Sequence, residues 1–290
     1  MTVGPAQSTG QFLLRSMAAA LVILIEVLIR EDKLTVRQVI LGFLGGWLLA
    51  LILCAIAKHL PWRTAERVFV LWFLLFIVRG LNLMLEWYFF STEGLAATAR
   101  SGVSTTLGSL ALAIVVALLF PPLRVEGSLG RSMGALLAQH GWFSWAWRVV
   151  IGIVTYVFVY FVFGGIAFQF TKPYYTDPSY GLNLTLPSAG AVFKLQFVRG
   201  FTFLLASFFV LSGLKVSRLK QAWLMGLALF IPGGLAPLVA AEDWPVALRF
   251  YHTVEIFFQN FTTGVVLALL IGIVSSTQQH VSSGALTEKS

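Results

Sequence analysis

The chain has 290 residues, of which 58% are apolar and 11% are charged. A water-soluble domain carries about 45–50% apolar and about 25% charged residues. The composition therefore excludes an ordinary soluble domain and indicates that lipid surrounds most of the surface. The net charge of +8 comes from Lys and Arg residues spread over short segments, which does not favour nucleic acid as a partner. The single cysteine, Cys54, excludes an internal disulfide and a cysteine-based metal site.

Eight runs of the chain are apolar and long enough to cross a hydrocarbon core of about 30 Å. We therefore predict an all-α fold, a polytopic membrane bundle of eight transmembrane helices in a cell membrane, with membrane lipid as a partner. The predicted spans are residues 12–29, 39–57, 68–90, 102–120, 149–170, 192–214, 222–241 and 250–274.

The first span is short and contains Glu26. Because it lacks the small-residue cleavage site of a signal peptide, we expect it to be retained. An alternative is that it lies in the membrane interface instead of crossing. At the other end of the chain, residues 275–290 are polar and are expected to be a disordered tail.

The loops after the second, fourth and sixth spans hold more basic residues than the other loops. They contain Lys58, Arg63 and Arg67; Arg124, Arg131 and Arg148; and Lys215, Arg218 and Lys220. Cytoplasmic loops retain Lys and Arg, so both termini are predicted to be cytoplasmic. The first loop also has three basic residues, which weakens this pattern, although two acidic residues accompany them.

The two halves of the chain resemble each other. FIVRGL at 76–81 parallels FIPGGL at 230–235, Lys58 parallels Lys215, and the sequence from Thr105 parallels that from Thr262, all about 155 residues apart. We predict two four-helix repeats, residues 1–120 and 148–274, joined by a cytoplasmic connector, residues 121–147. Copies with four helices each would share the same orientation. The alternative is a chance likeness between apolar runs.

Ionisable and amide side chains interrupt three of the spans, where they are costly unless paired or functional. In the third and eighth spans their spacing places each set on one helical face. The third span carries Arg79, Asn82 and Glu86; the eighth carries Arg249, His252, Glu255, Gln259 and Thr263; and the sixth begins with Lys194, Gln196 and Arg199. On the predicted topology all three sets lie in the outer half of the membrane.

Two interpretations of this cluster remain open. In the first, the charges only lock helices together in a scaffold or sensor subunit, with Arg79 paired to Glu255 and Glu86 paired to Arg199 or Arg249. In the second, they line a polar cavity whose excess of cations favours a small anionic or amphipathic ligand, such as a lipid. The candidate ligand-binding residues are Arg79, Asn82, Glu86, Arg199, Arg249, His252, Glu255 and Gln259.

An enzyme is the third and least favoured class. His252 and Glu255 lie one helical turn apart and could move a proton. However, no nucleophile elbow accompanies them, and the other histidines offer no metal-ligand spacing with His252. Phosphate-binding and dinucleotide-binding glycine motifs are also absent from the sequence, so no cofactor is expected. Residues 171–190 form a long loop that either covers the cavity or is a plain surface loop.

Overall fold

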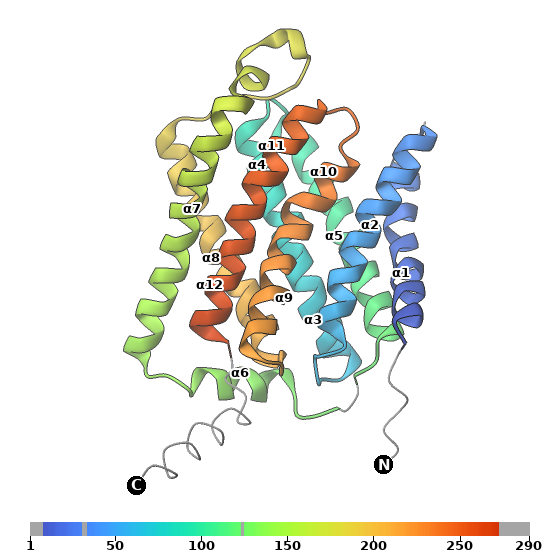
Figure 1. The fold of residues 1–290 in the computed structure, drawn as a ribbon, viewed down its shortest axis with the longest axis vertical. Helices are drawn as coiled ribbons and strands as arrows, with labels where there is room; N and C mark the ends of the chain where they lie inside the picture. Colours follow the sequence, from blue (N-terminus) through green and yellow to red (C-terminus); the bar gives the residue numbers. More distant parts are fainter. Residues whose placement is uncertain (1–7, 31–33, 123–124, 273–290) are drawn as a thin grey trace, which may run out of the picture.

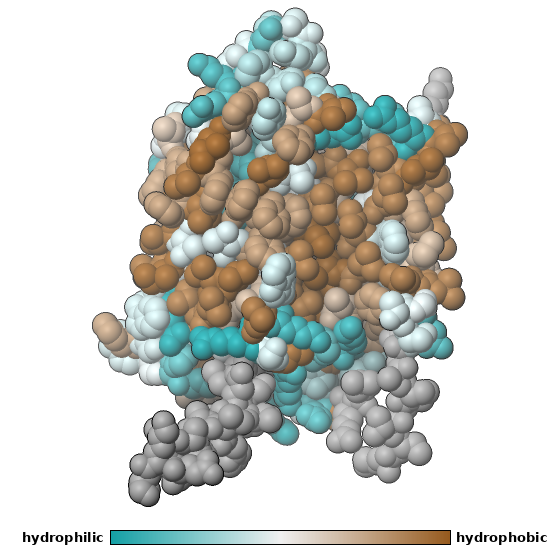
Figure 2. All heavy atoms as spheres, in the orientation of Figure 1, coloured by the Kyte–Doolittle hydropathy of each residue, from teal (hydrophilic) through white to brown (hydrophobic). Residues whose placement is uncertain are grey.

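The computed structural model describes residues 8–30, 34–122 and 125–272. Eight of its helical segments are long and apolar enough to cross a membrane, as predicted. The first described helix begins, and the last one ends, at the end of the bundle where α6 (Leu129–Leu137) lies (Figure 1). We call this the α6 end, and the opposite end, which holds η2 (Pro178–Tyr180), the η2 end. Figure 2 shows an apolar band between polar side chains at both ends.

Five spans are single helices. They are α1 (Thr9–Arg30), α2 (Val36–Ala57), α5 (Leu95–Leu119), α7 (Trp142–Thr176) and α8 (Ala189–Gly213). The first of them, α1, packs along α2 and α5 and runs in the direction of the other spans (Figure 1). This favours a crossing helix over one that lies in the interface.

The other three spans each contain one π-helical turn. The third span is α3 (Thr64–Leu75), η1 (Phe76–Leu81) and α4 (Asn82–Phe90); the seventh is α9 (Arg218–Phe230), η3 (Ile231–Leu235) and α10 (Ala236–Ala240); the eighth is α11 (Val246–Ile256), η4 (Phe257–Phe261) and α12 (Thr262–Ile271). The wider turns η1 and η3 fall on FIVRGL and IPGGL, the segments whose likeness suggested a repeat. Such turns are frequent at functional sites.

Helix α7 is longer than predicted at both ends. It begins at Trp142, so Trp142, Trp145 and Trp147 belong to its first turns and not to the predicted connector. It also continues to Thr176, so the first residues of the predicted loop 171–190 are helical. The predicted span, residues 149–170, was too short because polar residues are mixed with the aromatic ones at both ends of the helix. Arg124 and the predicted tail lie outside the described residues.

The helices of the two halves have equivalent neighbours. In the first half, α1 packs against α2 and α5, and the third span packs against α5. In the second half, α7 packs against α8 and the eighth span, and the seventh span packs against α12. Across the halves, α2 contacts the seventh span as α8 contacts the third, and η1 meets η3. This arrangement fits two four-helix repeats, which remain a prediction.

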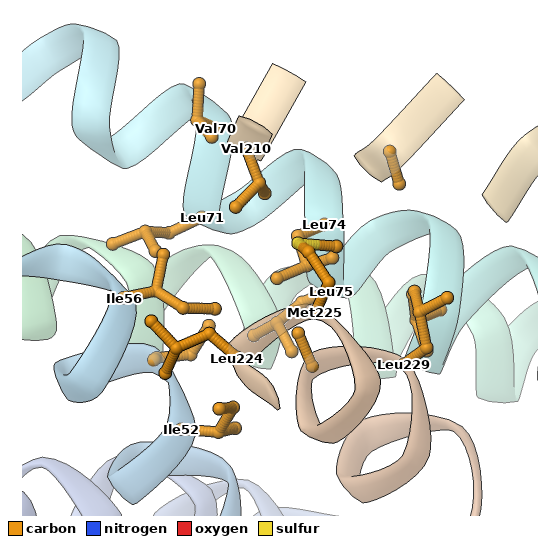
Figure 3. Close-up of a cluster of buried hydrophobic side chains, with 14 of the residues drawn as sticks. Ile52, Ile56, Val70, Leu71, Leu74, Leu75, Val210, Leu224, Met225 and Leu229 are labelled. Carbon is orange, nitrogen blue, oxygen red and sulfur yellow. The ribbon is translucent and has the colours of Figure 1, made fainter. Parts of the chain in front are cut away.

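The α6 end of the bundle is densely packed. Figure 3 shows a cluster of buried side chains there from α2, α3, α8 and α9, including Ile56, Leu71 and Met225. Buried Arg67 donates hydrogen bonds to the carbonyls of Ala57, Ala117 and Phe120, which end α2 and α5. These bonds satisfy carbonyls that a helix end leaves without partners.

Candidate functional site

A cavity of about 860 Å³ occupies the half of the bundle toward the η2 end. All eight spans contribute to its lining. The π-helical turns η1 and η3 provide its floor with Arg79, Gly80, Gly233 and Gly234. Its volume is within the range of about 300–1,000 Å³ that is usual for small-molecule sites. The cavity is therefore large enough for a small-molecule ligand.

Part of the loop between α7 and α8 lies against this cavity. Leu184, Leu186 and Pro187 belong to its lining. The backbone of the loop is attached to the end of α4, because Thr92 N donates to the Asn183 carbonyl and Thr185 N donates to the Phe90 carbonyl. The interpretation of this loop as a cover is thus favoured over that of a plain surface loop.

The charges of the lining differ from those expected. Among the described residues, the lining contains four carboxylates, from Glu26, Glu86, Asp243 and Glu255, against the side chains of Arg79 and His252. Lys194, Arg199 and Arg249 do not belong to it. The predicted excess of cations is therefore wrong for the cavity surface. Helical spacing predicted which face of each helix is polar, but it did not predict which of the charged side chains reach the cavity.

Arg79 pairs with Glu26 of α1. The two guanidinium nitrogens of Arg79 lie 3.2 Å from the Glu26 carboxylate oxygens. Arg79 also donates to the Thr105 carbonyl and to Ser109 Oγ, each at 3.3 Å. The predicted pair of Arg79 with Glu255 is therefore wrong. The sequence shows that Glu26 lies within the first span, but it does not show which helix the side chain faces.

A glycine makes room for this pair. A Cβ atom at Gly108 of α5 would overlap the carboxylate of Glu26. The first span can therefore bring an acidic side chain against α5 only because residue 108 has no side chain. Glu26 and Arg79 are largely buried, with 9% and 14% of their side chains exposed.

Glu86 pairs with Arg199, which is one of the two partners predicted for it. The distance between Arg199 Nη2 and Glu86 Oε2 is 3.2 Å. Arg199 is 4% exposed, and its guanidinium lies over the rings of Tyr156 and Phe203. Glu86 is 30% exposed and belongs to the cavity lining. The carboxylate thus faces the cavity, and its cation lies behind it.

His252 and Glu255 form a hydrogen-bonded row with two further side chains. His252 Nδ1 lies 2.9 Å from Glu255 Oε2, and Gln259 Nε2 donates to Glu255 Oε1 at 2.8 Å. On the other side of the ring, Tyr175 Oη lies 3.2 Å from His252 Nε2. His252 and Glu255, which the sequence placed one helical turn apart, are thus in contact. Tyr175 was missed because it was placed in a loop.

The remaining candidate residues do not reach the cavity. Asn82 is buried and donates from Nδ2 to the Ile77 carbonyl at 2.8 Å and to Thr202 Oγ1 at 3.1 Å, which ties η1 to α8. Gln259 supports Glu255 from behind, and Thr263 bonds to the backbone of its own helix. Arg249 is half-buried, outside the lining. The polar stripe of the eighth span therefore lines the cavity in part and is structural in part.

Aromatic rings surround the His252 end of the cavity. Trp87 and Trp244 are stacked with ring centroids 6.3 Å apart, and the Trp244 ring lies 5.9 Å from that of His252. Tyr175 and Phe90 complete this group, and the rings of Phe90, Trp87, Tyr175 and Trp244 all belong to the lining. The sequence did not predict this group, because its rings come from three separate segments: α4, α7 and the loop before α11.

Two other histidines lie outside the spans, at the α6 end. Burial, together with the nearby Lys220 and Lys58, lowers the pKa of His59 to about 4. Burial, with Arg148 nearby, also lowers the pKa of His140. Both imidazoles are therefore uncharged at neutral pH. In the part of the chain that the structure describes, no three His, Cys, Asp or Glu side chains gather as metal ligands would.

No protein-family model, curated protein or solved structure matches this chain. Its function is therefore inferred from the cavity alone.

Proposed function

We propose that this multi-pass membrane protein binds an amphipathic molecule in the cavity at the η2 end. The proposal rests on the size of the cavity together with the kinds of residues that line it. About 860 Å³ of open space is bounded by residues from all eight spans, most of them apolar, and by the side chains of Arg79, His252 and four carboxylates. An amphipathic ligand would place its chain along the apolar walls and its polar group at the charged residues.

The competing function is a scaffold whose charges only join helices. The pairs Arg79–Glu26 and Arg199–Glu86 both join different spans, as that function requires. However, a scaffold gains nothing from an open space beside its ion pairs, since interiors are normally filled. Arg79, Glu86 and Glu255 all face the cavity, which favours binding.

The proposal is tested by filling the cavity. Gly165 of α7 lies in the lining, and a Cβ atom there would have no heavy atom within 4 Å. Gly165→Trp should therefore occupy part of the cavity without disturbing the fold. Gly10→Trp is the matched control, because Gly10 has equal space but lies in α1 at the α6 end, outside the lining.

Native mass spectrometry of the purified, delipidated protein with added lysophosphatidylethanolamine gives the readout. The wild type and Gly10→Trp should bind the lysolipid with the same stoichiometry, and Gly165→Trp should lose at least one bound molecule. Equal binding by all three folded proteins would mean that the lysolipid contacts only the outer surface, and the scaffold function would then be favoured.

A further inference from the structure

We propose that the His252 end of the cavity binds the ammonium group of the amphipathic ligand, and that this cation displaces a proton held by His252 and Glu255. The inference rests on the proposed function and adds to it the class of headgroup and a coupling to pH.

The charge that remains after pairing is negative. Arg79 is neutralised by Glu26, and Glu86 is neutralised by Arg199, which lies behind it. The carboxylates of Glu255 and Asp243 are left in the lining, where no further Lys or Arg of the described residues accompanies them. Glu255 is 11% exposed, so little water screens its charge. A cation at this end would therefore be attracted, and an anion would be repelled.

The aromatic rings favour the same kind of headgroup. The faces of Trp and Tyr rings carry negative electrostatic potential and attract organic cations within about 6 Å. Trp87, Trp244 and Tyr175 line the cavity at the end where His252 and Glu255 lie. Quaternary ammonium groups are bound in proteins by such combinations of rings and carboxylates. A phosphate or sulfate group would gain nothing from these rings.

The hydrogen bonds of His252 make the charge at this end of the cavity depend on whether the imidazole is protonated. When the imidazole is neutral and Nδ1 carries the hydrogen, Nδ1 donates to Glu255 and Nε2 accepts from Tyr175, so the pair of His252 and Glu255 has a charge of −1. When the imidazole is protonated, the pair has no net charge. The ammonium group should thus bind to the first form, and the proton released from the imidazolium passes to water.

Other groups that share this space are Tyr160 and Tyr175 of α7, Glu86 of α4 with Arg199 behind it, and Asp243 before α11. Of these side-chain types and histidine, only the imidazole ordinarily exchanges its proton between about pH 5.5 and 7.5. Binding of the cation and of the proton must weaken each other by the same factor. Affinity for the ammonium group should therefore rise with pH across this range.

Three probes with the same hexadecyl chain test the inference: hexadecyltrimethylammonium, hexadecyl phosphate and the uncharged hexadecyl maltoside. Their binding to the purified protein is measured in the same detergent at pH 5.5 and 7.5. At pH 7.5 the ammonium probe should bind at least tenfold more tightly than the phosphate probe, and its affinity should fall severalfold at pH 5.5.

Variants separate the two parts of the inference. Glu255→Gln should abolish the preference for the ammonium probe. His252→Gln should keep that preference and remove the pH dependence. Asp177→Asn is the control, because Asp177 is an exposed carboxylate at the η2 end that lies outside the lining, and it should behave as the wild type.

Each contrary outcome has a distinct meaning. If none of the three probes binds, the proposed function itself is wrong. If all three bind equally, or if the phosphate probe binds most tightly, the cavity takes an amphipathic ligand but the ammonium site is wrong. If His252→Gln retains the pH dependence of the wild type, the exchange of a cation for a proton at His252 is wrong.

Discussion

At the scale of single residues, the two arginine pairs differ in what they leave exposed. Arg199 is almost fully buried, with its guanidinium over the rings of Tyr156 and Phe203, and its partner Glu86 faces the cavity. Arg79 and Glu26 both belong to the lining, and Arg79 has two further acceptors on α5. Burying a charge is tolerated only where a partner and hydrogen bonds compensate it. The pair with Glu26 therefore holds α1, the outermost helix of the first half, to the centre of the bundle.

A double-mutant cycle tests this role. Arg79→Leu or Glu26→Leu leaves one buried charge without its partner and should lower the free energy of unfolding by about 3–5 kcal/mol. The double variant should lose much less than the sum of the two. Reversible unfolding in detergent micelles, followed by circular dichroism, measures these differences. The cycle of Arg79→Leu with Glu255→Leu is the control and should be additive to within about 0.5 kcal/mol. Coupling in the control cycle, and none in the first, would contradict the assignment.

The sequence predicted contacts within one helix better than contacts between helices. The spacing of His252, Glu255 and Gln259 was enough to predict that they share one face, because helical geometry fixes their relative positions. In the structure they are also in contact. Arg79 gave no such constraint, since several acids on other spans were possible partners. Its true partner, Glu26, depends on Gly108, whose missing side chain could be interpreted only with the helices in place.

At the scale of helices, close packing in the second half depends on glycine. A Cβ atom at Gly264 of α12 would overlap the backbone carbonyl of Met225 in α9. The eighth and seventh spans therefore touch backbone to backbone, which small residues permit in membrane helices. The same close approach holds α2 against the seventh span, where a Cβ at Gly45 would lie 2.9 Å from the Ala236 carbonyl. Spans were predictable from hydropathy, but the π-helical turns and these contacts were not.

Substitution of Gly264 tests this packing. Gly264→Ala should lower stability by about 1–3 kcal/mol, because the backbone of α9 cannot move away as a flexible side chain could. Gly165→Ala in α7 is the matched control, since nothing lies within 4 Å of its Cβ position. There the gain in helix propensity should leave stability unchanged or raise it by up to about 1 kcal/mol. Thermal denaturation of the two purified variants gives the comparison, and equal stability would show that α9 and α12 can separate at little cost.

At the scale of the whole molecule, basic side chains gather at one end. The α6 end holds Lys58, Arg63, Arg131, Arg148, Lys215, Arg218 and Lys220 among its described residues. The η2 end holds fewer, and the cavity lies in the half of the bundle toward it. If basic residues face the cytoplasm, the cavity lies in the outer half of the membrane, the half nearer the external solution. The orientation thus decides which pool of ligand and protons the protein meets.

The last prediction concerns this orientation. Cys54 is fully buried, so cysteines introduced at exposed positions can be distinguished from it. Ser179 lies in η2, and Gly130 lies in α6 with no heavy atom within 4 Å of its Cβ position. In intact cells an impermeant thiol reagent should label Ser179→Cys and should label Gly130→Cys only after the membrane is opened.

The unmodified protein is the control and should stay unlabelled in both conditions. Labelling of Gly130→Cys alone in intact cells would keep the eight spans but reverse the orientation, and the cavity would then lie in the cytoplasmic half of the membrane. Labelling of both cysteines in intact cells would place residues 130 and 179 on the same side of the membrane. The chain between them would then cross an even number of times, which contradicts the single span α7 that joins them. The number of crossings and their direction are therefore tested by separate outcomes.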